Sequence, residues 1–198
     1  MRIVLVILGM LVTALAVWFL FGFALSRWEV NRRYREIERI QAIIRLVKQD
    51  PTDPTPLREL VNYADRREDW DRTQMFAQMR ELGPAFQKAP QTRKVFDEIL
   101  LPVIKKGLDD PSGGVRRESA LAAGAFGPLS KPAMWELIQA IKKYPNEDTA
   151  LFSAEALGEI GPEAREAIPA IEEVEKTWPG FEQTIERSLQ KIRGDPKQ

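Results

Sequence analysis

The dipeptide Gly-Pro recurs along the chain, at Gly83-Pro84, Gly127-Pro128 and Gly161-Pro162, with spacings of 44 and 34 residues. A glycine after the last helical residue can take the left-handed conformation that caps a helix. A proline cannot continue that helix, but it can open the next one. Recurrence at this period is typical of stacked helical hairpins, because one hairpin alone cannot bury its apolar side. We therefore predict units in which two helices are joined at a Gly-Pro turn.

The apolar spacing around each pair predicts the helices of these units. We expect helices near 114–126 and 131–143 in the second unit, and near 149–160 and 166–176 in the third. The first unit is longer by about eleven residues and should hold an additional helix near 91–100. Capping helices are expected at 57–66 and along the stripe of Phe181, Ile185, Leu189 and Ile192. Small residues, among them Gly124, Ala156 and Gly158, should let neighbouring helices approach closely.

Two segments, VRRESALAAGAFGP at 115–128 and AEALGEIGPEAREAIPAI at 154–171, carry a family resemblance. They are similar to the HEAT family, in particular to the short bacterial HEAT-like repeats named after phycobilisome lyases. The loose signature of that family, V-R-x-x-A-x-x-A-L-G-x-I-G, precedes a proline-marked second helix. The resemblance covers residues 71–177. It implies an all-α fold, a short α-solenoid of about three HEAT-like hairpins plus capping helices, and use as a protein-binding scaffold.

The match differs between the units. Val115 and Arg116 fit the signature in the second unit, whereas Thr149 and Ala150 replace that pair in the third. The third unit matches at Ala154, Ala156, Leu157, Gly158, Ile160 and Gly161. The first unit keeps Arg72, Leu82 and Gly83 but has Arg80 at the first glycine, so it departs furthest.

Residues 3–25 contain no charged side chain, and such a helix would be about 34 Å long, enough to cross a hydrocarbon core of about 30 Å. We therefore predict one transmembrane helix in contact with lipid. More arginines follow this segment than precede it, which predicts a single-pass protein of a bacterial inner membrane with a cytoplasmic C-terminal domain. The alternative is cleavage after Ser26 and an extracytoplasmic binding domain. The residues predicted to set topology and lie at the membrane interface are Arg27, Trp28, Arg32, Arg33 and Arg35.

An apolar a/d seam follows, formed by Val30, Ile37, Ile40, Ile44 and Val47. It could form a homodimer through residues 30–47, but we favour packing on the neighbouring domain. Prolines at 51, 54 and 56 then predict a stiff linker. The resulting division is a transmembrane anchor (1–28), a juxtamembrane basic helix (29–49), a Pro-rich linker (50–56), the solenoid (57–193) and a disordered tail (194–198).

The composition limits the chemistry. The chain has no cysteine and no histidine, which excludes thiol nucleophiles, His-based triads and the usual zinc sites. Paired acids such as Asp109-Asp110, Glu147-Asp148 and Glu172-Glu173 could do acid–base work, but turns and polar helix faces suit solvation better. Residues 49–198 carry 21 basic and 26 acidic residues, which argues against nucleic acid as a partner. We predict no catalytic residue, no metal and no cofactor.

With catalytic, metal and cofactor sites not predicted, the function expected of this chain is protein binding through its surface. Trp135, Gln139 and Lys142 lie off the apolar stripe of their helix and are the predicted partner-binding residues; packing of Trp135 between units is the alternative. Trp70 and Trp178 are expected to pack between units. Arg116 and Arg117 could form a polar ladder or pair with Asp109 and Asp110.

We therefore predict a non-enzymatic, membrane-anchored scaffold or adaptor that docks a protein partner at the cytoplasmic face of a membrane. Three alternatives stay open: a small accessory subunit of a membrane protein complex, an extracytoplasmic binding domain, and a lyase-like enzyme.

Overall fold

The computed structural model describes residues 2–66, 68–145, 147–177 and 180–194, with side chains from Ser26 onward. Within these ranges the regular structure is helical and contains no strand, so the predicted all-α class is confirmed. The chain divides into two compact units, residues 1–39 and 40–198. Trp178 and residues 195–198 of the predicted tail lie outside the described part.

The first unit consists of one helix. Helix α1 (Arg2–Gln49) begins in this unit, and its last ten residues belong to the second. Between Ser26 and Arg39 most side chains are exposed, including Trp28 (59%), Val30 (65%) and Tyr34 (64%). An ion pair of 2.7 Å between Glu29 and Arg33 links successive turns.

The predicted inner-membrane location is contradicted. In the described part of the chain, no helix combines the length and the apolar character needed to cross a bilayer, which also leaves the predicted transmembrane helix without support. Helix α1 does not end with its apolar run but continues to Gln49 through ten charged residues. The side chains of residues 3–25, for which lipid contact was predicted, are not described.

In the second unit the end of α1 is part of the core. Ile40, Ile44 and Val47 of the predicted seam are 0–2% exposed, and Ile43 is buried beside them. This end of the seam therefore packs on the helices that follow, the arrangement favoured above over a homodimer. The Asp53 carboxylate accepts a hydrogen bond of 2.9 Å from the Thr55 amide, and α2 begins at Pro54, inside the predicted linker.

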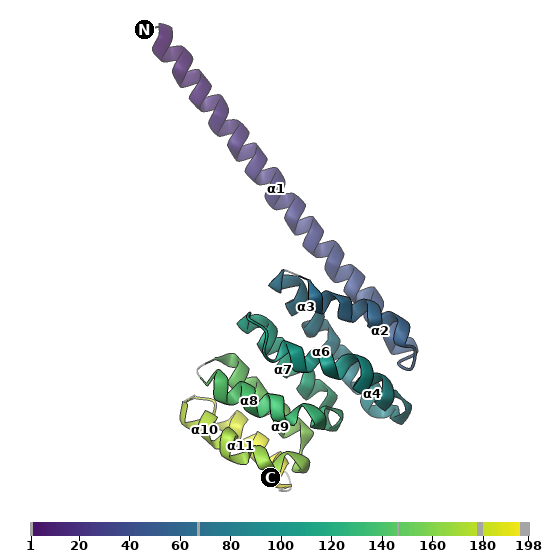
Figure 1. Ribbon diagram of the computed structural model, residues 1–198. Helices are drawn as coiled ribbons and strands as arrows, with labels where there is room; N and C mark the ends of the chain where they lie inside the picture. Colours follow the sequence, from purple (N-terminus) through teal and green to yellow (C-terminus); the bar gives the residue numbers. More distant parts are fainter. Residues whose placement is uncertain (1, 67, 146, 178–179, 195–198) are drawn as a thin grey trace. The chain divides into compact units, whose positions relative to one another are not determined.

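The remaining helices form stacked layers (Figure 1). One row contains the first helices of successive layers, α3 (Asp69–Met79), α7 (Gly113–Phe126), α9 (Asp148–Ile160) and α11 (Glu182–Arg193). The other contains the second helices α6 (Leu101–Gly107), α8 (Met134–Lys143) and α10 (Ile168–Thr177). Shorter segments connect the rows or precede them: α2 (Pro54–Val61), η1 (Asn62–Asp65), η2 (Arg80–Leu82), α4 (Gly83–Lys88), η3 (Pro90–Thr92), α5 (Arg93–Val95), the π-helix η4 (Phe96–Leu100), η5 (Gly127–Ala133) and η6 (Pro162–Ala167).

The Gly-Pro pairs do not all act as predicted. Gly127 and Gly161 end α7 and α9 with φ angles of 55° and 85°, so both occupy the region that favours glycine. The prediction is wrong at Gly83, which is helical with a φ of −46°. A Cβ atom at Gly83 would lie 2.1 Å from the carbonyl oxygen of Ala125, so this glycine is required by the close approach of α7.

Small residues bring the first helices together, as predicted. A Cβ atom at Gly124 would lie 3.3 Å from the Cα atom of Ala156, and one at Gly158 would lie 2.8 Å from the Cα atom of Ser188. The contacts between α7 and α9 and between α9 and α11 therefore depend on glycine.

Candidate functional site

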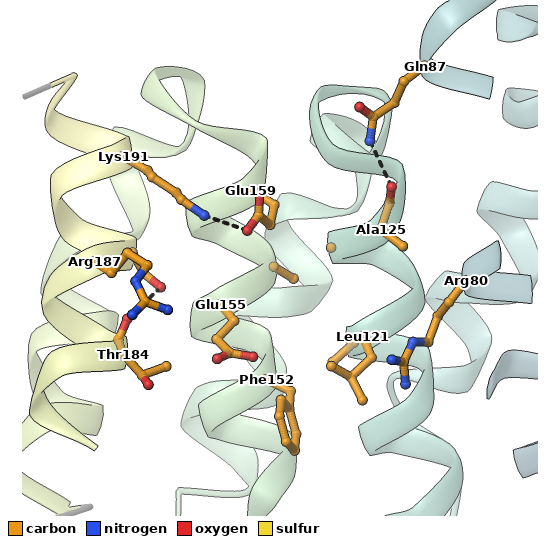
Figure 2. A pocket seen from close by; sticks show the side chains of 14 residues that line it. Arg80, Gln87, Leu121, Ala125, Phe152, Glu155, Glu159, Thr184, Arg187 and Lys191 are labelled. Carbon is orange, nitrogen blue, oxygen red and sulfur yellow. Dashed lines mark hydrogen bonds and ion pairs between the residues drawn. The ribbon is translucent and has the colours of Figure 1, made fainter. Parts of the chain in front are cut away.

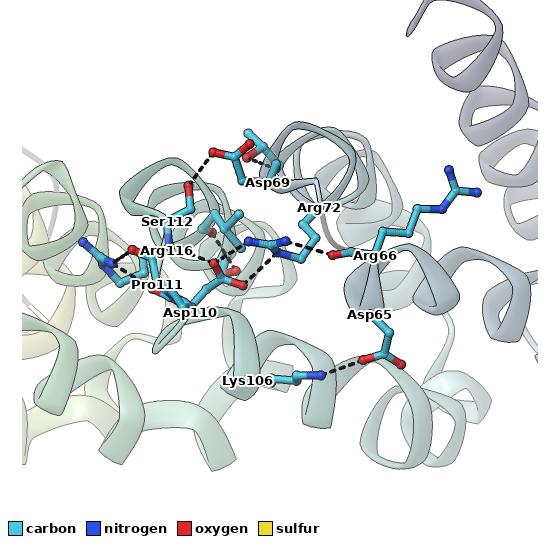
Figure 3. Close-up of polar contacts among 12 residues, drawn as sticks. Asp65, Arg66, Asp69, Arg72, Lys106, Asp110, Pro111, Ser112 and Arg116 are labelled. Atoms are coloured by element: carbon cyan, nitrogen blue, oxygen red, sulfur yellow. Dashed lines mark hydrogen bonds and ion pairs between the residues drawn. The ribbon is translucent and has the colours of Figure 1, made fainter. Parts of the chain in front are cut away.

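A polar ladder joins successive layers (Figure 3). The guanidinium group of Arg72 on α3 donates two hydrogen bonds, of 2.9 and 3.0 Å, to the carboxylate of Asp110 before α7. It also donates a bond of 2.8 Å to the carbonyl oxygen of Arg66. The Arg72 and Asp110 side chains are only 13% and 12% exposed. This rung is therefore a nearly buried, bidentate ion pair.

The same arrangement recurs one layer later. Arg116 on α7 donates to the carbonyl oxygens of Asp110 and Pro111 and forms an ion pair with Glu147, before α9. Both Arg72 and Arg116 thus bind the carbonyl group six residues earlier and an acid at the start of the next layer. The predicted ladder exists, but Arg116 binds the main chain of Asp110, and its carboxylate partner is Glu147.

Asp109 takes part in a separate contact. Its carboxylate accepts hydrogen bonds from Lys143 and from the Tyr144 hydroxyl, the latter of 2.9 Å. These bonds, the one from Lys143 first, lower the pKa of Asp109 below its ordinary value of 3.8. Arg117 pairs with Glu118 at 3.1 Å and with Asp148 of the next layer at 3.8 Å, not with Asp109 or Asp110. The acids at this turn therefore stabilise the stack, and the geometry assigns them no catalytic part.

The predicted partner-binding residues lie along the outer side of α8. Trp135 is 65% exposed, so it does not pack between units. Trp135 and Gln139 line a hollow of about 200 Å³ between α6 and α8, which Lys105 and Leu108 border from the other side. An ion pair of 2.9 Å between Lys105 and Glu136 spans this hollow.

Lys142 lies on the opposite side of the same helix. It borders a second hollow of about 530 Å³ between α8 and α10. Glu166, Glu173 and Thr177 form the polar part of its wall. The rest of the wall is mostly apolar and consists of Ile138, Ile141, Pro145, Pro169, Ala170 and Val174. The structure therefore separates Lys142 from Trp135 and Gln139 and makes α8 a ridge with a hollow on each side.

A groove of about 380 Å³ crosses the row of first helices (Figure 2). Arg80 and Gln87 border it at one end, and Arg187 and Lys191 of α11 border it at the other. An ion pair of 2.5 Å between Lys191 and Glu159 and a hydrogen bond of 2.7 Å from Gln87 to the Ala125 carbonyl oxygen lie along it. The sequence analysis did not predict this groove. The sequence feature that could have indicated the groove is the pair Glu155 and Glu159, four residues apart on a helix otherwise rich in apolar residues.

Glu155 stands inside this groove with a perturbed carboxyl group. Partial burial and the neighbouring charge of Glu159 raise its pKa above the ordinary value of 4.5, while Arg187 and Lys191 oppose the shift. A perturbed acid in a groove marks a candidate functional position. The described residues include no group of three or more acidic side chains placed to hold a metal ion.

The residues predicted at a membrane interface, Arg27, Trp28, Arg32, Arg33 and Arg35, all lie on the α1 part of the first unit. No membrane span supports that role, so we assign them none. Comparison with protein families finds no family model that matches this chain, and comparison with curated proteins finds no match. The functional argument therefore depends on the surfaces of the second unit.

Proposed function

We propose that this protein is a non-enzymatic binding scaffold, built as a short HEAT-like α-solenoid, that holds a protein partner against its second helices. The HEAT-like assignment has support from the repeated rung, since Arg72 and Arg116 make equivalent contacts 44 residues apart. It also has support from the glycine-ended helices α7 and α9. Stacked hairpins of this kind offer an extended surface to partners.

The exposure of Trp135 carries the proposal. A tryptophan that is 65% exposed leaves a large apolar surface in water, and nothing in the fold of the described residues requires it there. Trp is enriched among residues that dominate binding energies, where truncation costs about 2–4 kcal/mol. The hollows on either side of α8 could accept side chains from the partner that covers this indole.

The test uses two exposed aromatic residues of equal exposure. Trp135→Ala on α8 is compared with Tyr34→Ala on α1, where Tyr34 is 64% exposed. Both tagged variants and the unmodified chain are expressed at equal levels in the native cell, and co-purifying proteins are quantified. We expect a protein whose recovery falls at least tenfold with Trp135→Ala and stays unchanged with Tyr34→Ala. Equal recovery in all three samples would refute the assignment of this surface.

One observation favours a second candidate, a lyase-like activity. That activity needs a ligand-sized cleft lined by acids, and the groove across the first helices contains Glu155 and Glu159. Glu159 is held by Lys191 in an ion pair of 2.5 Å, which leaves Glu155 without a second free acid. We therefore favour binding. The lyases of the family that this chain resembles attach bilins to cysteines of partner proteins, so a bilin added to the purified chain is the probe. Only the lyase-like candidate predicts a shift of the bilin absorbance spectrum that Glu155→Gln removes.

A further inference from the structure

We draw no further inference here: the strongest candidate, the mostly apolar hollow of about 530 Å³ between α8 and α10, belongs to the binding surface already proposed, has charges of both signs on its rim in Lys142, Glu166 and Glu173, and nothing in the structure shows what covers it.

Discussion

The rung between Arg72 and Asp110 gives the sharpest test of what holds the layers together. We consider Asp110→Ala, which removes the carboxylate and leaves the guanidinium group of Arg72 in place. Arg72 then keeps its bond of 2.8 Å to the Arg66 carbonyl oxygen but loses both bonds to the next layer. Because the Arg72 side chain is only 13% exposed, water replaces the lost partner poorly.

The magnitude follows from this burial. Removal of one partner from a buried ion pair costs about 3–5 kcal/mol, because the other charge remains buried and unpaired. The small remaining exposure of both groups places the expected loss near the lower limit, about 3 kcal/mol. Asp110 also accepts a bond of 2.9 Å from the Ser112 amide in the turn before α7, and loss of that turn bond contributes to the same figure.

A matched control separates burial from the mere presence of an ion pair. Arg93 and Asp97 form an exposed pair of 2.7 Å, with side chains 46% and 39% exposed. Asp97→Ala should cost only about 0.3–0.5 kcal/mol. Asp110→Asn is a second control, because it keeps an acceptor for the Ser112 amide and loses the charge.

The assay is urea unfolding followed by circular dichroism, with free energies from linear extrapolation. In a thermal scan the loss at Asp110→Ala corresponds to a fall in Tm of roughly 6–12 °C. The Asp110→Asn variant should lie between the unmodified chain and Asp110→Ala. If Asp110→Ala and Asp97→Ala lose equal stability, buried charge pairing between layers is not what stabilises the stack.

Three other perturbations follow from the geometry. Gly83→Ala should destabilise the fold by about 1–3 kcal/mol because its Cβ atom meets the Ala125 carbonyl oxygen. Gly114→Ala, whose Cβ atom has its nearest neighbour 3.5 Å away, should instead stabilise α7 by up to about 1 kcal/mol, and urea unfolding of both variants checks the opposite signs. Glu155 has a raised pKa in the folded state, so its ionisation destabilises the fold as the pH rises from about 4.5 through that raised pKa. Glu155→Gln should therefore increase the free energy of unfolding at pH 7 and lessen the loss of stability with rising pH. Asp109 has a lowered pKa, so it stabilises the folded state above pH 3.8, and this stabilisation is lost as the pH falls through the lowered pKa. In an NMR titration, Lys143→Met should bring the pKa of Asp109 back toward 3.8.

Local sequence rules predicted the helices well where helices are long and apolar spacing is regular. The predicted segments 114–126 and 149–160 correspond to α7 and α9 within one residue at each end. Their boundaries follow from residues that stop a helix by their own backbone preferences, such as Gly127 and Gly161. The segment expected at 131–143 begins as the 3₁₀ turn η5 instead, because Pro132 interrupts regular hydrogen bonding there.

Contacts between layers could not be predicted in the same way. Gly83 follows the same motif as Gly127, yet it is helical, and glycine is required there because the carbonyl oxygen of Ala125 occupies the space that a Cβ atom would need. The pairing of Arg116 with Glu147 instead of the nearer carboxylates likewise depends on how two layers stack. The apolar run at 3–25 predicted a membrane span from composition alone, although α1 continues as a charged helix into the second unit.

The ladder also explains why the two ends of the stack differ. Arg72 and Arg116 each reach an acid in the next layer, but Ala150 occupies the corresponding position of α9 and cannot do so. The contact between α9 and α11 instead depends on Gly158 against Ser188 and on the exposed pair of Glu159 and Lys191. In the described residues no buried ion pair joins α9 to α11, so this contact depends on close packing and on an exposed pair. Among the described residues, the buried arginine that repeats in α3 and α7 is therefore not repeated in α9.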